Sequence, residues 1–252
     1  MSNPPLYGNM VPLDRNLHKK LKLRTDMPVA RHAAEQNSMF LTVAEFPEAC
    51  KEYPIVFVRV GEPATAGGKP TVAPVAALGL KQGSNLFVDG DKWTGNYVPA
   101  YLRRYPFAMA RLEQGSDQIA VCFDNQWAGF NATEGHDLFK EDGTPSEFLE
   151  GARQFLENFE QEAERTRLVC EKLVAEDLLT DMRFEANFGD GNKLEVDGFL
   201  AIDEKKFSEL SDAKVVELFR LGLLTAIEMQ RLSMGNMQRL ASLHGTAAAK
   251  QA

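Results

Sequence analysis

Residues 145–179 carry a long amphipathic pattern that constrains the fold more than any other feature of the chain. Apolar residues recur at helical spacing while glutamates occupy the opposite face, which predicts a long surface helix with one apolar stripe turned inward. Thr144, Pro145 and Glu147 predict its start, as N-cap threonine, first-turn proline and third-position glutamate. The stripe consists of Phe148, Ala152, Phe155, Phe159, Ala163, Thr166, Cys170 and Leu173.

The segment before this helix has mostly β-strand patterns. Thr42 and Glu45 predict a capping box that opens a short helix at 42–49. Runs of β-branched and aromatic residues predict strands within 53–60, 72–80, 85–93, 105–114 and 118–124. The 85–93 run turns at 89–91, and a second turn falls at 115–117. Strands joined mostly by short turns favour an antiparallel, meandering sheet in the N-terminal half.

The C-terminal part returns to strands and then to helices. Alternating apolar residues on both sides of 187–193 predict a β-hairpin, and Ser211 with Asp212 predicts a helix start. A last helix is expected over 224–243, with Met229, Leu232, Met237 and Leu240 as its packing face. The chain is therefore expected to be α+β, with an extended lead-in at 1–40, a single domain at 41–245, a C-terminal helical pair and a frayed tail at 246–252.

Composition excludes several classes of function. A formal net charge of -8 argues against broad binding to nucleic acids or anionic membranes. Cys50, Cys122 and Cys170 have no zinc-ligand spacing and suit a reducing compartment. The apolar runs are too short for a membrane span, and the first residues lack the order of a secretory signal. We therefore expect a soluble, cytoplasmic protein, with signal-independent export to the surface left open.

The best candidate for a ligand site is the segment 96–107, NYVPAYLRRYPF. Adjacent Arg103 and Arg104 can clamp a carboxylate or phosphate, and tyrosines can supply stacking and hydroxyl groups. Tyr97, Tyr101 and Tyr105 recur every four residues, so they also fit one face of a short helix that Pro106 ends. The two arginines cannot share that face. One is expected to pair with a carboxylate and the other to be solvated, and both the binding and the structural interpretation stay open.

Three further residues are weaker candidates. Asp89 lies in a DGD sequence like the start of a calcium loop, but Ala100 stands at the twelfth position, where a carboxylate is needed. His136 lies near Glu134 without a second histidine at a suitable place, so an iron site is not expected. No dinucleotide, phosphate-loop or nucleophile-elbow motif is present, so we expect no metal and no cofactor and assign no catalytic residue.

Four segments together resemble the SapC family. They are NPPLYGNMVPLDRNLH near the start, the strand YPIVFV, the segment NLFVDGDKWTGNYVPAYLRRYPF, and LGLLTAIEMQRLSMGNMQRL near the end. The resemblance covers residues 3–243 and does not concern the identically named permease of a peptide transporter. It implies a bacterial protein whose family name refers to a surface layer. No catalytic mechanism comes with it.

The resemblance implies an accessory role. Family members lie near genes for outer-membrane receptors, flavin-dependent halogenase-like proteins and cupin-like proteins, which suggests nutrient uptake or peptide modification. The leading hypothesis is therefore an accessory or binding protein with a protein partner or a small anionic or peptide ligand. One alternative is an enzyme whose anionic substrate is anchored by Arg103, Arg104 and Tyr101. Another is a structural partner in surface-layer assembly that uses the helix at 225–243.

Overall fold

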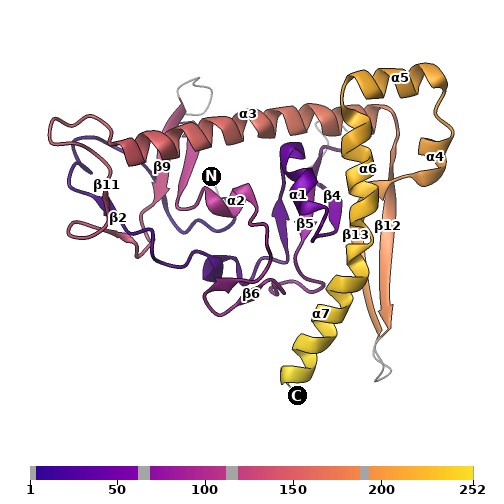
Figure 1. Cartoon of the computed structure of the whole chain (residues 1–252), viewed down its shortest axis with the longest axis horizontal. Coiled ribbons are helices and arrows are strands. Elements are labelled where there is room, and N and C mark those ends of the chain that lie inside the picture. The colour runs from indigo at the N-terminus through magenta and orange to yellow at the C-terminus, as the bar shows by residue number, and fades with distance from the viewer. Residues whose placement is uncertain (1–3, 62–68, 112–118, 188–192, 252) are drawn as a thin grey trace. The chain divides into compact units, whose positions relative to one another are not determined.

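The computed structural model describes residues 4–61, 69–111, 119–187 and 193–251 (Figure 1). These residues divide into two compact units. The first unit contains residues 1–33, 90–92 and 100–161. The second contains 34–89, 93–99 and 162–252. The helix α3 (Glu147–Ala175) supplies residues to both units. The fold is α+β with antiparallel sheets, as the sequence predicts.

The residue that caps α3 is not the expected one. The hydroxyl of Ser146, not that of Thr144, accepts a hydrogen bond from the Leu149 N–H at 3.2 Å. Thr144 is engaged elsewhere, because its hydroxyl donates to Asp142 at 2.6 Å and its carbonyl accepts from the backbone of Lys140. The inward stripe is confirmed at its buried positions, which include Phe159, Thr166, Cys170 and Leu173, with Leu149 and Leu156 added.

The first unit contains short strands arranged in two three-stranded sheets. β1 (Met10–Pro12), β9 (Ile119–Asp124) and β8 (Phe107–Arg111) form one, in the order β1-β9-β8. β10 (Phe130–Asn131), β2 (Lys22–Leu23) and β11 (His136–Asp137) form the other, in the order β10-β2-β11. The unit also holds the 3-10 helix η1 (Ala30–Ala33) and the short α2 (Ala100–Arg103). Part of the expected lead-in thus pairs with strands from far along the chain. The turn expected at 115–117 lies outside the described residues.

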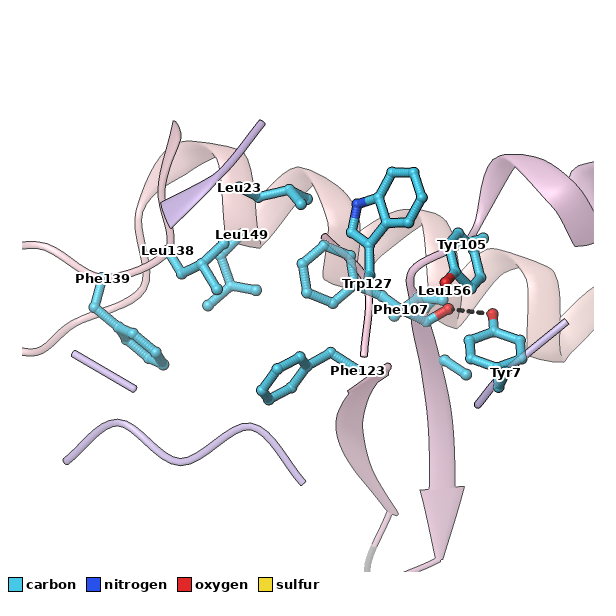
Figure 2. Packing of buried hydrophobic residues seen from close by; sticks show 11 residues of the cluster. Tyr7, Leu23, Tyr105, Phe107, Phe123, Trp127, Leu138, Phe139, Leu149 and Leu156 are labelled. Atoms are coloured by element: carbon cyan, nitrogen blue, oxygen red, sulfur yellow. Dashed lines mark hydrogen bonds between the residues drawn. The ribbon is translucent and has the colours of Figure 1, made fainter. Parts of the chain in front are cut away.

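Aromatic side chains dominate the core of the first unit (Figure 2). Tyr7 lies within this core although it comes from the N-terminal lead-in, and its hydroxyl donates to the carbonyl oxygen of Phe107 at 2.7 Å. Trp127 meets the ring of Tyr105 edge-on at 5.4 Å between centroids. Burying such large rings stabilises the unit by about 1.5–3 kcal/mol for each side chain fully removed from water.

The second unit is built on a five-stranded antiparallel sheet. Its strands are β12 (Leu179–Asn187), β13 (Lys193–Ile202), β4 (Ile55–Arg59), β5 (Val72–Ala77) and β3 (Ser38–Phe40), and they lie in that order. The hairpin β12–β13 is confirmed, although the residues of its turn at 188–192 are not described. The expected meander is thus divided, because β4 and β5 join this sheet while β8 and β9 belong to the first unit.

Short elements flank the sheet strands along the chain. The predicted capping box is present, because the Glu45 carboxylate accepts from the Thr42 N–H at 2.8 Å. It opens the 3-10 helix η2 (Val43–Glu45), which leads into α1 (Phe46–Ala49). β6 (Val88–Asp89) and β7 (Lys92–Trp93) form the expected hairpin at 89–91.

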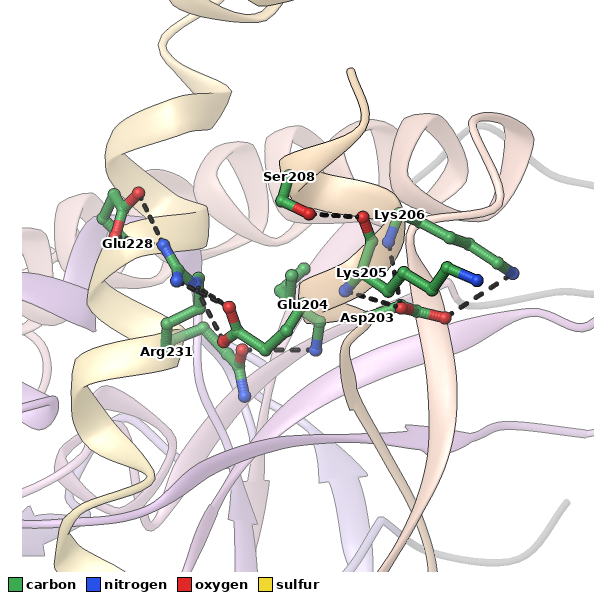
Figure 3. Close-up of polar contacts among 9 residues, drawn as sticks. Asp203, Glu204, Lys205, Lys206, Ser208, Glu228 and Arg231 are labelled. Carbon is green, nitrogen blue, oxygen red and sulfur yellow. Dashed lines mark hydrogen bonds and ion pairs between the residues drawn. The ribbon is translucent and has the colours of Figure 1, made fainter.

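Four helices complete the second unit: α4 (Glu204–Ser208), α5 (Asp212–Arg220), α6 (Leu223–Ser233) and α7 (Asn236–Gln251). Ser211 caps α5 as predicted, accepting from the Lys214 N–H. Asp203 caps α4, and Arg231 of α6 binds Glu204 at 2.6 Å and Glu228 at 2.8 Å (Figure 3). These contacts fix α4 against α6.

The last predicted helix is divided into α6 and α7. The backbone forms 3-10-type turns at Met234 and Gly235, because their N–H groups donate to carbonyls three residues back rather than four. The expected packing face is correct for Met237 and Leu240, but Leu232 is 73% exposed. Its place is taken by the polar Gln230, whose side chain hydrogen bonds to the backbone of Ile55 and Ile202. α7 covers most of the residues expected to fray.

Candidate functional site

The helix that carries the arginine pair is shorter than expected. α2 contains Tyr101, but Tyr97 precedes it and Tyr105 follows it, so the three tyrosines do not share a helical face. The prolines at 99 and 106 border this short turn, and proline disfavours helix on both its own and the preceding residue. Tyr97 also belongs to the second unit, whereas the arginines belong to the first. The predicted five-residue set is therefore not a single helical cluster.

Arg104 is the buried member of the pair. Its side chain is only 8% exposed and lies against aromatic rings. The guanidinium carbon is 4.1 Å from the ring centroid of Tyr101, 4.6 Å from that of Phe159 and 5.7 Å from that of Tyr7. The electron-rich ring faces stabilise a cation that has lost most of its water, by about 2 kcal/mol for a desolvated contact.

Arg103 is exposed, as expected for one member of the pair. Its guanidinium carbon lies 5.3 Å from the ring centroid of Phe155. Phe155 and Phe159 are four residues apart and so lie on one face of α3. Arg103 therefore contacts Phe155, and Arg104 contacts Phe159 on the next turn of the same helix.

The hydrogen-bonding capacity of Arg104 is incompletely used. Its carboxylate partner, Glu160, lies 3.5 Å away, at the limit of a hydrogen bond, and is 43% exposed. The Nε atom of Arg104 is buried and has no acceptor among the residues that the structure describes. Burial raises the pKa of Glu160, although the Arg104 charge lowers it. The pair is therefore loosely matched, with a buried donor left over on the arginine.

The tyrosine hydroxyls of the segment are used in structural contacts. Tyr101 donates to the carbonyl oxygen of Pro5 at 3.1 Å and so holds the N-terminal segment. Tyr97 donates to the Glu45 carboxylate at 2.8 Å in the second unit. Burial raises the pKa of Tyr101, an effect that Arg104 opposes, so this hydroxyl stays protonated at neutral pH.

Asp124 organises the other side of the same cluster. The carboxylate is 2% exposed and accepts hydrogen bonds from the N–H groups of Gly8, Asn9 and Gln126 and from the Tyr105 hydroxyl. Burial alone would raise the pKa of Asp124, but these hydrogen bonds outweigh it and hold the pKa below its ordinary value. The sequence places Asp124 at the end of a predicted strand and gives no signal of this role, because its partners at 8 and 9 lie 115 residues or more away.

The sequence also does not predict two aromatic neighbours of Tyr105. His32 stacks on the ring of Tyr105 at 5.0 Å and meets Trp127 edge-on at 4.7 Å. Burial lowers the pKa of His32, while the charge of Asp124 raises it. A lone histidine next to the η1 alanines gives no sequence signal of such a contact, because the rings it touches come from distant segments.

The weaker candidates lie in separate surroundings. Asp89 is exposed in the β6–β7 hairpin. Glu134 lies 3.6 Å from Arg24, and His136 stacks on Phe148 at 4.6 Å with nearly parallel rings. Within the described ranges, no group of three or more metal-ligating side chains gathers at one point.

The fold and this cluster define an α+β protein with antiparallel sheets in which a buried arginine is enclosed by aromatic rings. The model of the SapC family matches residues 13–240, and the chain belongs to that family. No curated protein and no solved structure matches the chain. Among the described residues, no helix combines the length and the apolar character needed to cross a bilayer.

Proposed function

We propose that this protein is an accessory binding protein, and that Arg104 with Arg103 and Tyr101 anchors a carboxylate of its ligand. The observation that carries the proposal is the unsatisfied state of Arg104. The guanidinium is buried, its Nε has no acceptor in the described part of the chain, and its carboxylate partner is 3.5 Å away. A buried donor without an acceptor costs about 1–3 kcal/mol, which a correctly placed ligand carboxylate would recover.

Glu160 then acts as a substitute for the ligand. Its half-exposed carboxylate stands beside Arg104 and can swing into water, because nearly half of its side chain is already solvated. A ligand carboxylate that reaches Arg104 side-on would make the two parallel hydrogen bonds that guanidinium geometry favours. The exposed Arg103, next along the chain, would contribute to a second carboxylate oxygen or a second acidic group.

This binding role is compatible with the family. Membership of the SapC family supports a bacterial protein that serves the cell surface, nutrient uptake or peptide modification, with a peptide or small acid as ligand. We propose that the protein lies in the cytoplasm, because its three cysteines are widely spaced and suit a reducing compartment. An enzyme that holds an anionic substrate on the same arginines is the alternative for this site.

Titration calorimetry with glutarate, a small dicarboxylate, tests the proposal through two variants with opposite effects. Arg104→Met removes the cation and should abolish binding. Glu160→Gln removes the competing carboxylate and should strengthen binding by about three- to tenfold, a gain of up to about 1.4 kcal/mol. Equal affinity of both variants and the wild type would contradict the proposal.

A second candidate function rests on a different observation. Val216, Phe219 and Leu221 in and after α5 are 46%, 71% and 54% exposed. Exposed apolar side chains gathered on one element are typical of a protein contact. This supports the surface-assembly hypothesis in a changed form, with α5 rather than the helix at 225–243 as the contact. Light scattering of Phe219→Ser against the wild type tests it, since loss of association in the variant is expected.

A further inference from the structure

The first unit has a hollow of about 990 Å³ that is lined by lysines. It lies beside the small sheet β10-β2-β11, whose register sets Lys22 opposite Asp137. The basic run near the N-terminus brings in Lys19 and Lys20, and the turn before α3 brings in Lys140. This volume is at the upper end of the range for ligand pockets, and it is larger than a simple ion would occupy.

Lysine charge is in surplus in the hollow. Lys22 is neutralised by Asp137 at 3.1 Å. Lys19, Lys20 and Lys140 are exposed and form no salt bridge within the described ranges, although the charge of Lys140 also acts on the nearby Asp142. Two carboxylates remain on the wall, from Glu141 and Glu147. Glu147 is in the first turn of α3, where a negative charge already interacts favourably with the helix dipole.

The hollow also has an aromatic wall. His136 and Phe148 stack at 4.6 Å with an angle of 6° between the rings, and both line the hollow. Flat rings beside separate ammonium groups can bind a peptide that carries both an apolar side chain and carboxylates. A small inorganic anion would use only the lysines.

From these contacts we infer that the lysine-lined hollow docks an acidic peptide segment of a partner protein that carries an aromatic or large apolar residue between its carboxylates. Lys19, Lys20 and Lys140 bind the carboxylates, and the His136–Phe148 pair receives the apolar side chain. Such a site is independent of Arg104. It gives a function to His136 and to the basic run, neither of which the arginine cluster uses.

Fluorescence anisotropy with the labelled peptide acetyl-Glu-Glu-Phe-Glu-Glu-amide tests the inference. The double variant Lys19→Gln/Lys20→Gln should weaken binding about tenfold. Lys81→Gln/Lys205→Gln changes the net charge equally at exposed lysines of the second unit, and it should change the affinity less than twofold. Raising the salt concentration from about 0.1 M to 1 M should weaken wild-type binding, because it shortens the screening length from about 10 Å to 3 Å.

Other outcomes would overturn the inference. If both double variants bound the peptide equally weakly, the peptide would be attracted only by the net charge of the protein. Competition by inorganic phosphate at the same concentration as unlabelled peptide would show an anion site without peptide specificity. Loss of peptide binding in Arg104→Met, with full binding in Lys19→Gln/Lys20→Gln, would assign the peptide to the arginine cluster. In that case the proposed function would stand and this site would not.

Discussion

The guanidinium carbon of Arg104 lies over the ring of Tyr101, 4.1 Å from the ring centroid. The contact joins two residues of the same short segment, and the ring centroid of Phe159 in α3 lies 4.6 Å from the same guanidinium carbon. The arginine is thus held in a fixed orientation while its hydrogen-bonding groups are only partly used. A fixed, under-used donor is a suitable anchor for a ligand, because little further ordering is needed when the ligand binds.

The first prediction concerns the shape of the arginine. Arg104→Lys should destabilise the protein by about 1–2 kcal/mol, because a compact ammonium cannot stack its plane on several rings. Arg103→Lys is the matched control and should change the stability by less than about 0.5 kcal/mol, since Arg103 is exposed. Urea denaturation followed by circular dichroism measures both. Equal losses in the two variants would argue against a special role for the buried position.

The second prediction concerns Asp124. Asp124→Asn should cost about 1–3 kcal/mol, because an amide nitrogen would replace one of two oxygens that accept from backbone N–H groups and from Tyr105. Urea denaturation at neutral pH gives the value. Asp142→Asn, at an exposed turn, is the control and should cost less.

The pH dependence of stability follows from the lowered pKa of Asp124. Because the folded carboxylate binds its proton at lower pH than the unfolded one, its stabilising effect is complete above the ordinary aspartate pKa of about 3.9. That effect is lost as the pH falls through the folded pKa. The stability difference between wild type and Asp124→Asn should therefore shrink as the pH falls below about 4. A constant difference over this range would contradict the prediction.

A third prediction concerns Gly95 in the second unit. A Cβ atom at this position would lie 2.3 Å from the Tyr53 hydroxyl oxygen and 2.7 Å from a carboxylate oxygen of the buried Glu52. Gly95→Ala should therefore destabilise the protein by about 1–3 kcal/mol. Gly151→Ala is the control with the opposite sign, because Gly151 lies inside α3 and the place where its Cβ would lie is open space. Gly151→Ala should stabilise the protein by about 0.4–1 kcal/mol. Thermal unfolding measures both variants against the wild type.

Local patterns in the sequence were sufficient to predict most elements. The long helix α3, the Thr42–Glu45 capping box and the β12–β13 hairpin each depend on residues close together in the chain, and all are confirmed. The sequence predicts the cap of α3 two residues too early, because Thr144 and Ser146 are both good caps and only the turn around Asp142 decides between them.

The candidate site depended on long-range contacts and could be predicted only in part. The sequence predicts that one arginine pairs with a carboxylate and the other is solvated, because the two side chains cannot share a face. Arg104 lies 3.5 Å from Glu160, and Arg103 is exposed. The rings that enclose Arg104 come from residues 7 and 159, and no local pattern links them to residue 104. Lys140 and the basic run at 19–22 are similarly distant, so the lysine-lined hollow has no sequence signature.

The binding of a carboxylate at Arg104 is tested most directly by the NMR signal of its Nε–H group. In a nitrogen–proton correlation spectrum the signal is assigned by its absence in Arg104→Met. On titration with glutarate it should move progressively and saturably, because a buried donor that lacks an acceptor gains one. The movement should be larger in Glu160→Gln. An Arg104 signal that stays in place at saturating glutarate, in a protein that remains folded, would contradict the proposed function.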